Sequence, residues 1–83
     1  MIKLEDLKRI EVFKTDVKDP EDANRLILEI DNAFSGCIAN FDLTDCDRIL
    51  RIKHPPTIDP ASFIELLDRL GYQAEVLSDN LPQ

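Results

Sequence analysis

The sequence predicts an α+β fold in which four strands and two helices follow one another in the order β-α-β-β-α-β. Two observations lead to this prediction. The dipeptide Asp-Pro occurs at 19–20 and again at 59–60, and the apolar residues that follow it are spaced three and four apart, as in an amphipathic helix. Around these two segments apolar and polar residues tend to alternate, which is typical of half-buried strands.

The first strand is expected over residues 10–17, which are rich in β-branched and aromatic side chains. The first helix follows, because the Asp19 side chain can accept hydrogen bonds from exposed helix amides and Pro20 suits the first helical position. Ser35 and Gly36 end this helix. Its apolar face consists of Ala23, Leu26, Ile27, Ile30, Ala33 and Phe34.

Residues 37–43 and 48–53 are expected to form a hairpin around the turn residues 44–47. If Leu43 pairs with Arg48, antiparallel pairing sets the apolar residues of both strands on one face, which supports this register. The other opposite pairs are then Phe41 with Leu50, Ala39 with Ile52, and Cys37 with His54.

The second half of the chain repeats the pattern of the first. Residues 55–57, Pro-Pro-Thr, break the strand, and Asp59-Pro60 starts a helix that Gly71 stops. The apolar face of this helix is formed by Phe63, Leu66, Leu67 and Leu70. A last strand is expected over 73–77, followed by a polar tail. Right-handed crossovers then place both helices on one face of a four-stranded antiparallel sheet, the ferredoxin-like arrangement. We expect one domain over residues 1–83, with a core of about 10–77.

Charge and composition narrow the classes of function. The chain carries 17 acidic and 10 basic residues and a formal net charge of −7. Such a field repels phosphate backbones and anionic lipid, so neither a nucleic acid nor a membrane is expected as a partner. The first residues show no hydrophobic signal core, so we expect a cytoplasmic protein whose two cysteines, Cys37 and Cys46, are reduced.

Two short motifs resemble the heavy-metal-associated domain of copper chaperones and metal-pumping ATPases. Residues 70–76, Leu-Gly-Tyr-Gln-Ala-Glu-Val, are similar to the family's Gly-Tyr-x-Ala-x-Val ending, with Gly71, Tyr72 and Ala74 at the matching positions. Gly36 and the segment 39–43 are similar to the family's glycine and second strand. The resemblance covers about residues 10–77, and it implies the ferredoxin-like fold.

The residues that bind metal in this family are missing. The family holds soft metal ions with Met-x-Cys-x-x-Cys between the first strand and the first helix, since thiolates are soft ligands. Counting back from Gly36 and from the apolar face of the helix puts Pro20 and Ala23 at the two cysteine positions, and residues 16–23 contain no cysteine, histidine or methionine. The resemblance therefore implies a scaffold that has lost the metal motif, and we expect no cofactor.

Three other side chains could in principle hold a soft metal. Cys37 and His54 are predicted to face each other across the hairpin, and two such ligands could begin a Zn or Cu site, although a stable site needs three or four. Alternatively, Cys37 is simply a small core residue. Cys46 is expected at the hairpin tip, between Asp45 and Asp47. Its thiol could take part in a redox reaction or bind a metal, or Cys46 could be an ordinary turn residue.

Acidic residues are expected to gather at the end of the fold that carries the hairpin tip and the first strand–helix loop. They could bind a hard cation or form a shallow patch for a basic partner. Helix capping and the helix dipole are sufficient to explain why Asp19 and Asp22 occur at the start of the first helix. The candidate patch consists of Asp16, Asp19, Glu21, Asp22, Asp45 and Asp47.

The sequence favours a binding role over catalysis. It has one histidine, no Ser/His/Asp or Cys/His grouping at matching ends of the fold and no glycine-rich phosphate loop, so we do not expect an enzyme. The leading hypothesis is a small cytoplasmic interaction module that uses the acidic end or an exposed sheet edge, with a protein partner or as a homodimer. The alternative is a Cu or Zn carrier that uses Cys37, His54 or Cys46.

Overall fold

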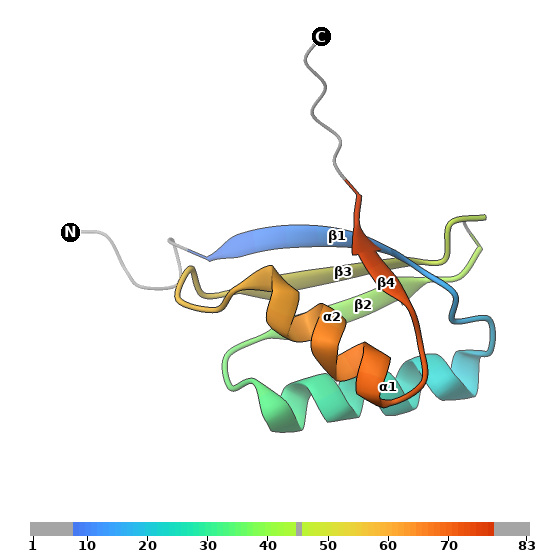
Figure 1. Ribbon diagram of the computed structural model, residues 1–83, viewed down its shortest axis with the longest axis horizontal. Coiled ribbons are helices and arrows are strands. Elements are labelled where there is room, and N and C mark those ends of the chain that lie inside the picture. The colour runs from blue at the N-terminus through green and yellow to red at the C-terminus, as the bar shows by residue number, and fades with distance from the viewer. Residues whose placement is uncertain (1–7, 45, 78–83) are drawn as a thin grey trace, which may run out of the picture.

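The computed structural model describes residues 8–44 and 46–77, and it confirms the predicted order of elements (Figure 1). Strand β1 spans Arg9–Thr15, helix α1 Pro20–Ala33, strand β2 Ile38–Asp42, strand β3 Ile49–His54, helix α2 Pro60–Arg69 and strand β4 Ala74–Val76. Neither described helix is long and apolar enough to cross a membrane.

The four strands form one antiparallel sheet in the order β2-β3-β1-β4, so β1 and β3 are central and β2 and β4 lie at the edges. Both helices lie on the same face of this sheet (Figure 1). The fold is therefore the ferredoxin-like α+β arrangement that the sequence predicts.

The hairpin register is confirmed. Ala39 lies opposite Ile52 and Phe41 opposite Leu50, within a paired segment that runs from Ile38 and Lys53 to Asp42 and Ile49. The predicted pairs at either end, Cys37 with His54 and Leu43 with Arg48, fall just beyond this segment. Matching the apolar residues of the two strands was sufficient to set the register, because a shift by one residue would turn each side chain to the opposite face.

Both helices begin as predicted. Asp19 Oδ1 accepts a hydrogen bond of 3.1 Å from the backbone N–H of Glu21, and Asp59 Oδ1 accepts one of 3.0 Å from that of Ala61. A proline occupies the first turn of each helix. After α2, Gly71 has a φ of +98°, a left-handed backbone conformation that favours glycine, and its N–H bonds to the carbonyl of Asp68.

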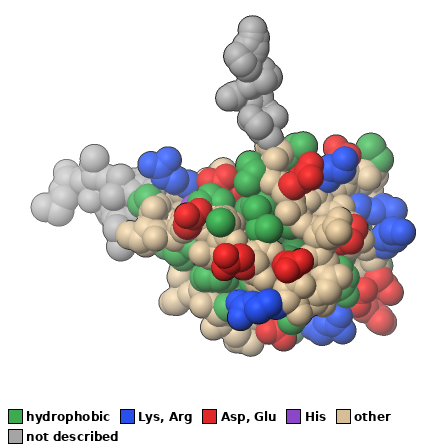
Figure 2. Space-filling model, in the orientation of Figure 1, with side chains coloured by type: hydrophobic (Ala, Val, Ile, Leu, Met, Phe, Trp, Pro, Cys, Tyr) green, Lys and Arg blue, Asp and Glu red, His purple; other side chains and the backbone are tan. Residues whose placement is uncertain are grey.

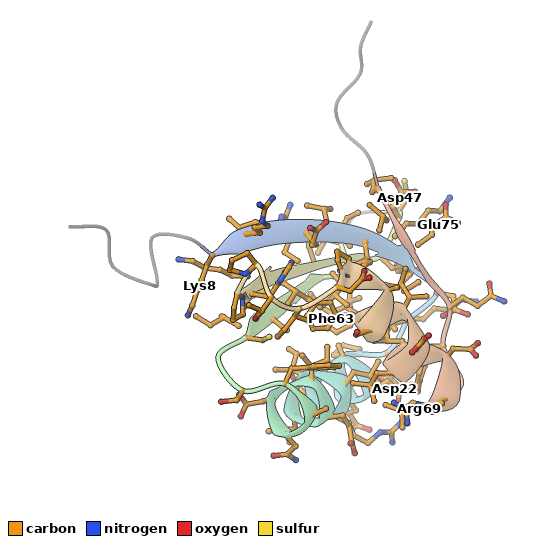
Figure 3. The ribbon with its side chains drawn as sticks, turned by 60° about the vertical axis from the view of Figure 1, so that its left-hand side comes forward. Lys8, Asp22, Asp47, Phe63, Arg69 and Glu75 are labelled. Carbon is orange, nitrogen blue, oxygen red and sulfur yellow. The ribbon has the colours of Figure 1, made fainter. Side chains whose placement is uncertain are left out.

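The core lies between the sheet and the helices, around the ring of Phe63 from α2 (Figure 3). This ring meets those of Phe13, Phe34 and His54 edge-on, with centroids 6.2, 4.8 and 5.3 Å away. Other buried core residues are Ile30, Leu50, Ile52, Leu66 and Leu67.

Some details at element ends differ from the sequence-based expectation. Strand β1 ends at Thr15, although Val17 is fully buried in the loop that follows. Ala33 and Leu70, expected on the apolar helix faces, are exposed. Each lies where its helix ends, and in α1 the partly buried Phe34 completes the apolar face instead.

Candidate functional site

The sheet presents its second face outward, away from α1 and α2 (Figure 1). Because side chains alternate along a strand, Ile10, Arg51 and Lys53 point outward while Phe13, Leu50 and Ile52 point into the core. The registers place Ile38, Lys53 and Ile10 side by side in one row across β2, β3 and β1. Ile38 is 55% and Ile10 65% exposed, so neither side chain contributes to the core.

A groove runs between α1 and the edge strand β2; we call it the α1/β2 groove. Its volume is about 250 Å³, and it is mostly apolar. Leu28 at this groove is 63% exposed, and Ile38 is exposed on the strand side. The groove is lined by Ile27, Leu28, Ile30, Asp31, Cys37, Ile38 and Ala39. An exposed apolar groove beside an open strand edge is typical of a protein contact site.

The predicted acidic residues are largely engaged in local structure. Asp16 Oδ1 accepts a hydrogen bond of 2.9 Å from the N–H of Gln73, and Asp19 caps α1. Asp22 lies 3.4 Å from Arg25, and Asp47 lies 3.9 Å from Lys14. Glu21 occupies the first turn of α1, where it complements the helix dipole. Asp45 lies outside the described residues.

Asp16 and Asp47 lie on neighbouring segments, since the N–H of Thr15 bonds to the carbonyl of Asp47 at 3.2 Å, whereas Asp22 lies in the first turn of α1. Figure 3 shows Asp22 on helix α1 and Asp47 beyond the sheet, on opposite sides of the molecule. Figure 2 shows acidic and basic side chains interspersed on the face that carries α2 and β4. Among the predicted patch residues that the structure describes, Asp22 and Asp47 have ion-pair partners, Arg25 and Lys14.

The residues of the Gly-Tyr-x-Ala motif connect α2 to β4. The phenol of Tyr72 accepts a hydrogen bond of 3.1 Å from Arg25, which ties this connection to α1. Desolvation, followed by a hydrogen bond to Asp22, raises the pKa of the phenol. Ala74 pairs with Thr15 and packs on the core, and Gly36 has a φ of +85° after α1. In this structure the motif residues have structural roles.

The three candidate soft ligands lie in different environments. Cys37 is buried, and this burial raises the pKa of its thiol, while the nearby Lys8 lowers it and Asp31 raises it further. Cys46 is exposed at the hairpin tip. Within residues 8–44 and 46–77, no three His, Cys, Asp or Glu side chains are placed to hold a metal ion together.

His54 is a core residue with one polar anchor. Its side chain is 1% exposed, and its Nδ1 lies 2.7 Å from the carbonyl oxygen of Pro55, which can only accept, so Nδ1 carries the proton. Its Nε2 lies 3.5 Å from Glu11 Oε2. Glu11 was not among the residues predicted from the sequence, although its position two residues before Phe13 places it on the inward side of β1.

No protein-family model matches the chain, and neither the curated proteins nor the solved structures include a significant match. The resemblance to the heavy-metal-associated domain therefore stays a prediction from its motifs.

Proposed function

We propose that this chain is a small, non-catalytic, cytoplasmic protein-interaction module that binds through the edge strand β2 and the α1/β2 groove. The observation that carries this proposal is the apolar surface along the edge, where Leu28 and Ile38 are 63% and 55% exposed. We also propose that the chain derives from the heavy-metal-associated domain. In this view it retained the fold, lost the two metal-binding cysteines and now binds a protein instead of a metal.

The backbone of β2 supports this role. Among the described residues, β2 pairs with β3 only, so the other side of the strand faces outward. An extended segment can add to such an edge through main-chain hydrogen bonds, while its alternate side chains fill an adjacent pocket. The α1/β2 groove lies directly beside the strand and can receive those side chains.

The second edge of the sheet suits this task less well. Strand β4 has three residues, whereas β2 has five. The hollow beside β4, about 430 Å³ in volume, is lined mainly by polar and charged side chains such as Asp16, Glu65 and Asp68. Burial of these carboxylates against a partner would carry a desolvation cost that the apolar β2 side avoids.

Site-specific photo-crosslinking in cells tests the proposal. A photoreactive phenylalanine analogue replaces Leu28 in the groove in one variant and Arg51 on the outer sheet face in the matched control, both at exposed positions. We expect a defined covalent adduct from position 28 and none from position 51. The adduct should disappear when Ile38→Lys is added. Equal crosslinking from both positions, or none from position 28, would refute the proposed surface.

A further inference from the structure

We propose that the α1/β2 groove binds a second copy of this chain, with the two β2 strands paired antiparallel about a two-fold axis at Asn40. This inference rests on the proposed function, because it names the partner of the same surface. The pairing joins two four-stranded sheets into one continuous sheet with all helices on one side. Such an edge-to-edge arrangement is a common way to protect an open strand.

The register follows from the two-fold axis. With Asn40 opposite Asn40 of the second copy, Ala39 lies opposite Phe41 on the inner face, and Ile38 lies opposite Asp42 on the outer face. Opposite residues then share a face, as a continuous sheet requires. The axis relates identical strand edges, so both copies satisfy the same contacts.

The inner face of this pairing matches a small side chain with a large one. Ala39 lines the groove, and Phe41 is partly buried against the core around Phe63 and against a second buried group formed by Val17, Ala23 and Leu26. At the junction between the two β2 strands, the Phe41 ring of each copy packs against Ala39 of the other copy, beside the apolar residues of the groove. Leu28 lies on α1 next to the same seam, which gives a reason for its exposure.

The outer face is complementary in charge. The β2–β3 register places Lys53 next to Ile38, so Asp42 of the second copy and Lys53 stand on either side of Ile38 in one row. Their backbones are then two strand spacings apart, roughly 10 Å, and the long flexible lysine stem can span much of this gap. Symmetry repeats the pair. A parallel arrangement of the strands would instead set Asp42 beside Asp42, which is repulsive.

Charge also argues against stacking the outer sheet faces of two copies. Apart from Lys14, which lies near Asp47 and Glu75, that face carries Arg51 and Lys53 on the central strand β3. A two-fold face-to-face contact would bring this basic group against its own equivalent and desolvate it. The edge pairing leaves Arg51 in solvent on both copies, and it buries mainly apolar side chains.

Sedimentation equilibrium on the full chain tests the inference, from about 1 µM to about 1 mM protein. We expect reversible growth from the monomer mass of 9.5 kDa to twice that value. Leu28→Lys should weaken the dimer at least tenfold, whereas Ile10→Lys, a matched change at an equally exposed position on β1, should not. Lys53→Glu should also weaken it, because it sets two carboxylates in one row.

A disulfide test locates the axis. Asn40→Cys places identical thiols opposite each other, within the Cα separation that a disulfide needs. We expect rapid oxidation to a covalent dimer in a Cys46→Ser background, and none for Arg51→Cys in the same background. A chain that stays monomeric at 1 mM, or equal crosslinking of the two variants, would overturn the inference. A position-28 photo-adduct with a different protein would then leave the proposed function intact.

Discussion

Nε2 of His54 lies 3.5 Å from Oε2 of Glu11, inside the layer between sheet and helices. The two residues come from the neighbouring strands β3 and β1, where Glu11 pairs with Ile52 and is therefore diagonal to His54. Arg9 of β1 lies directly opposite His54 in this register, and among the described residues Nε2 has no hydrogen-bond partner. The histidine is held by Pro55 on one side and by the Phe63 ring on another.

His54→Ala should destabilise the fold by about 2–4 kcal/mol, because it leaves a cavity beside Phe63 and removes one of the two hydrogen bonds that the Pro55 carbonyl accepts. Glu11→Gln keeps the shape of the side chain, so its cost should stay below about 1 kcal/mol. Urea unfolding followed by circular dichroism measures both. A loss below about 0.5 kcal/mol for His54→Ala would show that the histidine does not anchor the core.

Phe63 should be the most sensitive core position of α2, since its ring contacts three other rings. We expect Phe63→Ala to cost about 3–5 kcal/mol and Phe63→Leu less than about 1.5 kcal/mol. Ile10→Ala, at a site that is 65% exposed, is the control and should change stability by less than about 0.5 kcal/mol. Comparable losses for Phe63→Ala and Ile10→Ala would contradict this description of the core.

The two cysteines should react at very different rates. Cys46 is exposed, whereas Cys37 is buried with a raised pKa, so an aromatic disulfide reagent at neutral pH should modify one thiol quickly and the other only after unfolding. Cys46→Ser should remove the fast phase, and Cys37→Ser the slow one. Two fast thiols in the native protein would refute the burial of Cys37.

The same burial predicts a loss of stability at alkaline pH. The pKa of Cys37 is higher in the folded than in the unfolded chain, so the unfolded chain releases this proton first as the pH rises. The contribution of Cys37 is thus complete below the pKa of a free thiol and falls above it. Cys37→Ala should flatten the alkaline part of the stability curve measured by urea unfolding. An unchanged slope would contradict the prediction.

The two helix caps should contribute similar amounts. Asp19→Ala and Asp59→Ala each remove one side-chain acceptor from an exposed amide, and we expect a loss of about 1 kcal/mol each. Asparagine at either position retains an acceptor and should come close to the wild type. Thermal unfolding of the alanine and asparagine pairs measures the difference. An asparagine variant as unstable as its alanine counterpart would mean that the caps do not act through this bond.

Gly71→Ala isolates the effect of backbone conformation. A Cβ at this position has no neighbouring atom within 4 Å, so the cost arises from the φ of +98° alone. We expect a loss of about 1 kcal/mol, read from urea unfolding. Gly71→Asn tolerates the left-handed region better and should lose less. If alanine at this position is neutral, the helix does not end in the left-handed conformation.

The elements that the sequence predicts best are those defined by local chemistry. Asp19-Pro20 and Asp59-Pro60 specify helix starts within a few residues, and the alternation of residues 37–43 against 48–53 specifies the hairpin register. The end of β1 and the exposure of Ala33 depend on how each element packs against its neighbours in the folded chain. This information is not contained in the spacing of apolar residues along a single element.

Local patterns were sufficient to predict the order of elements, the antiparallel hairpin and the two helices on one face of the sheet, because caps and periodicity act over a few neighbouring residues. The tertiary structure decided the site. It placed Glu11 beside His54 across two strands, bonded Asp16 to the N–H of Gln73, and brought Leu28 of α1 and Ile38 of β2 to the same groove. These relationships depend on packing between elements that are distant in the chain, and no local pattern encodes them.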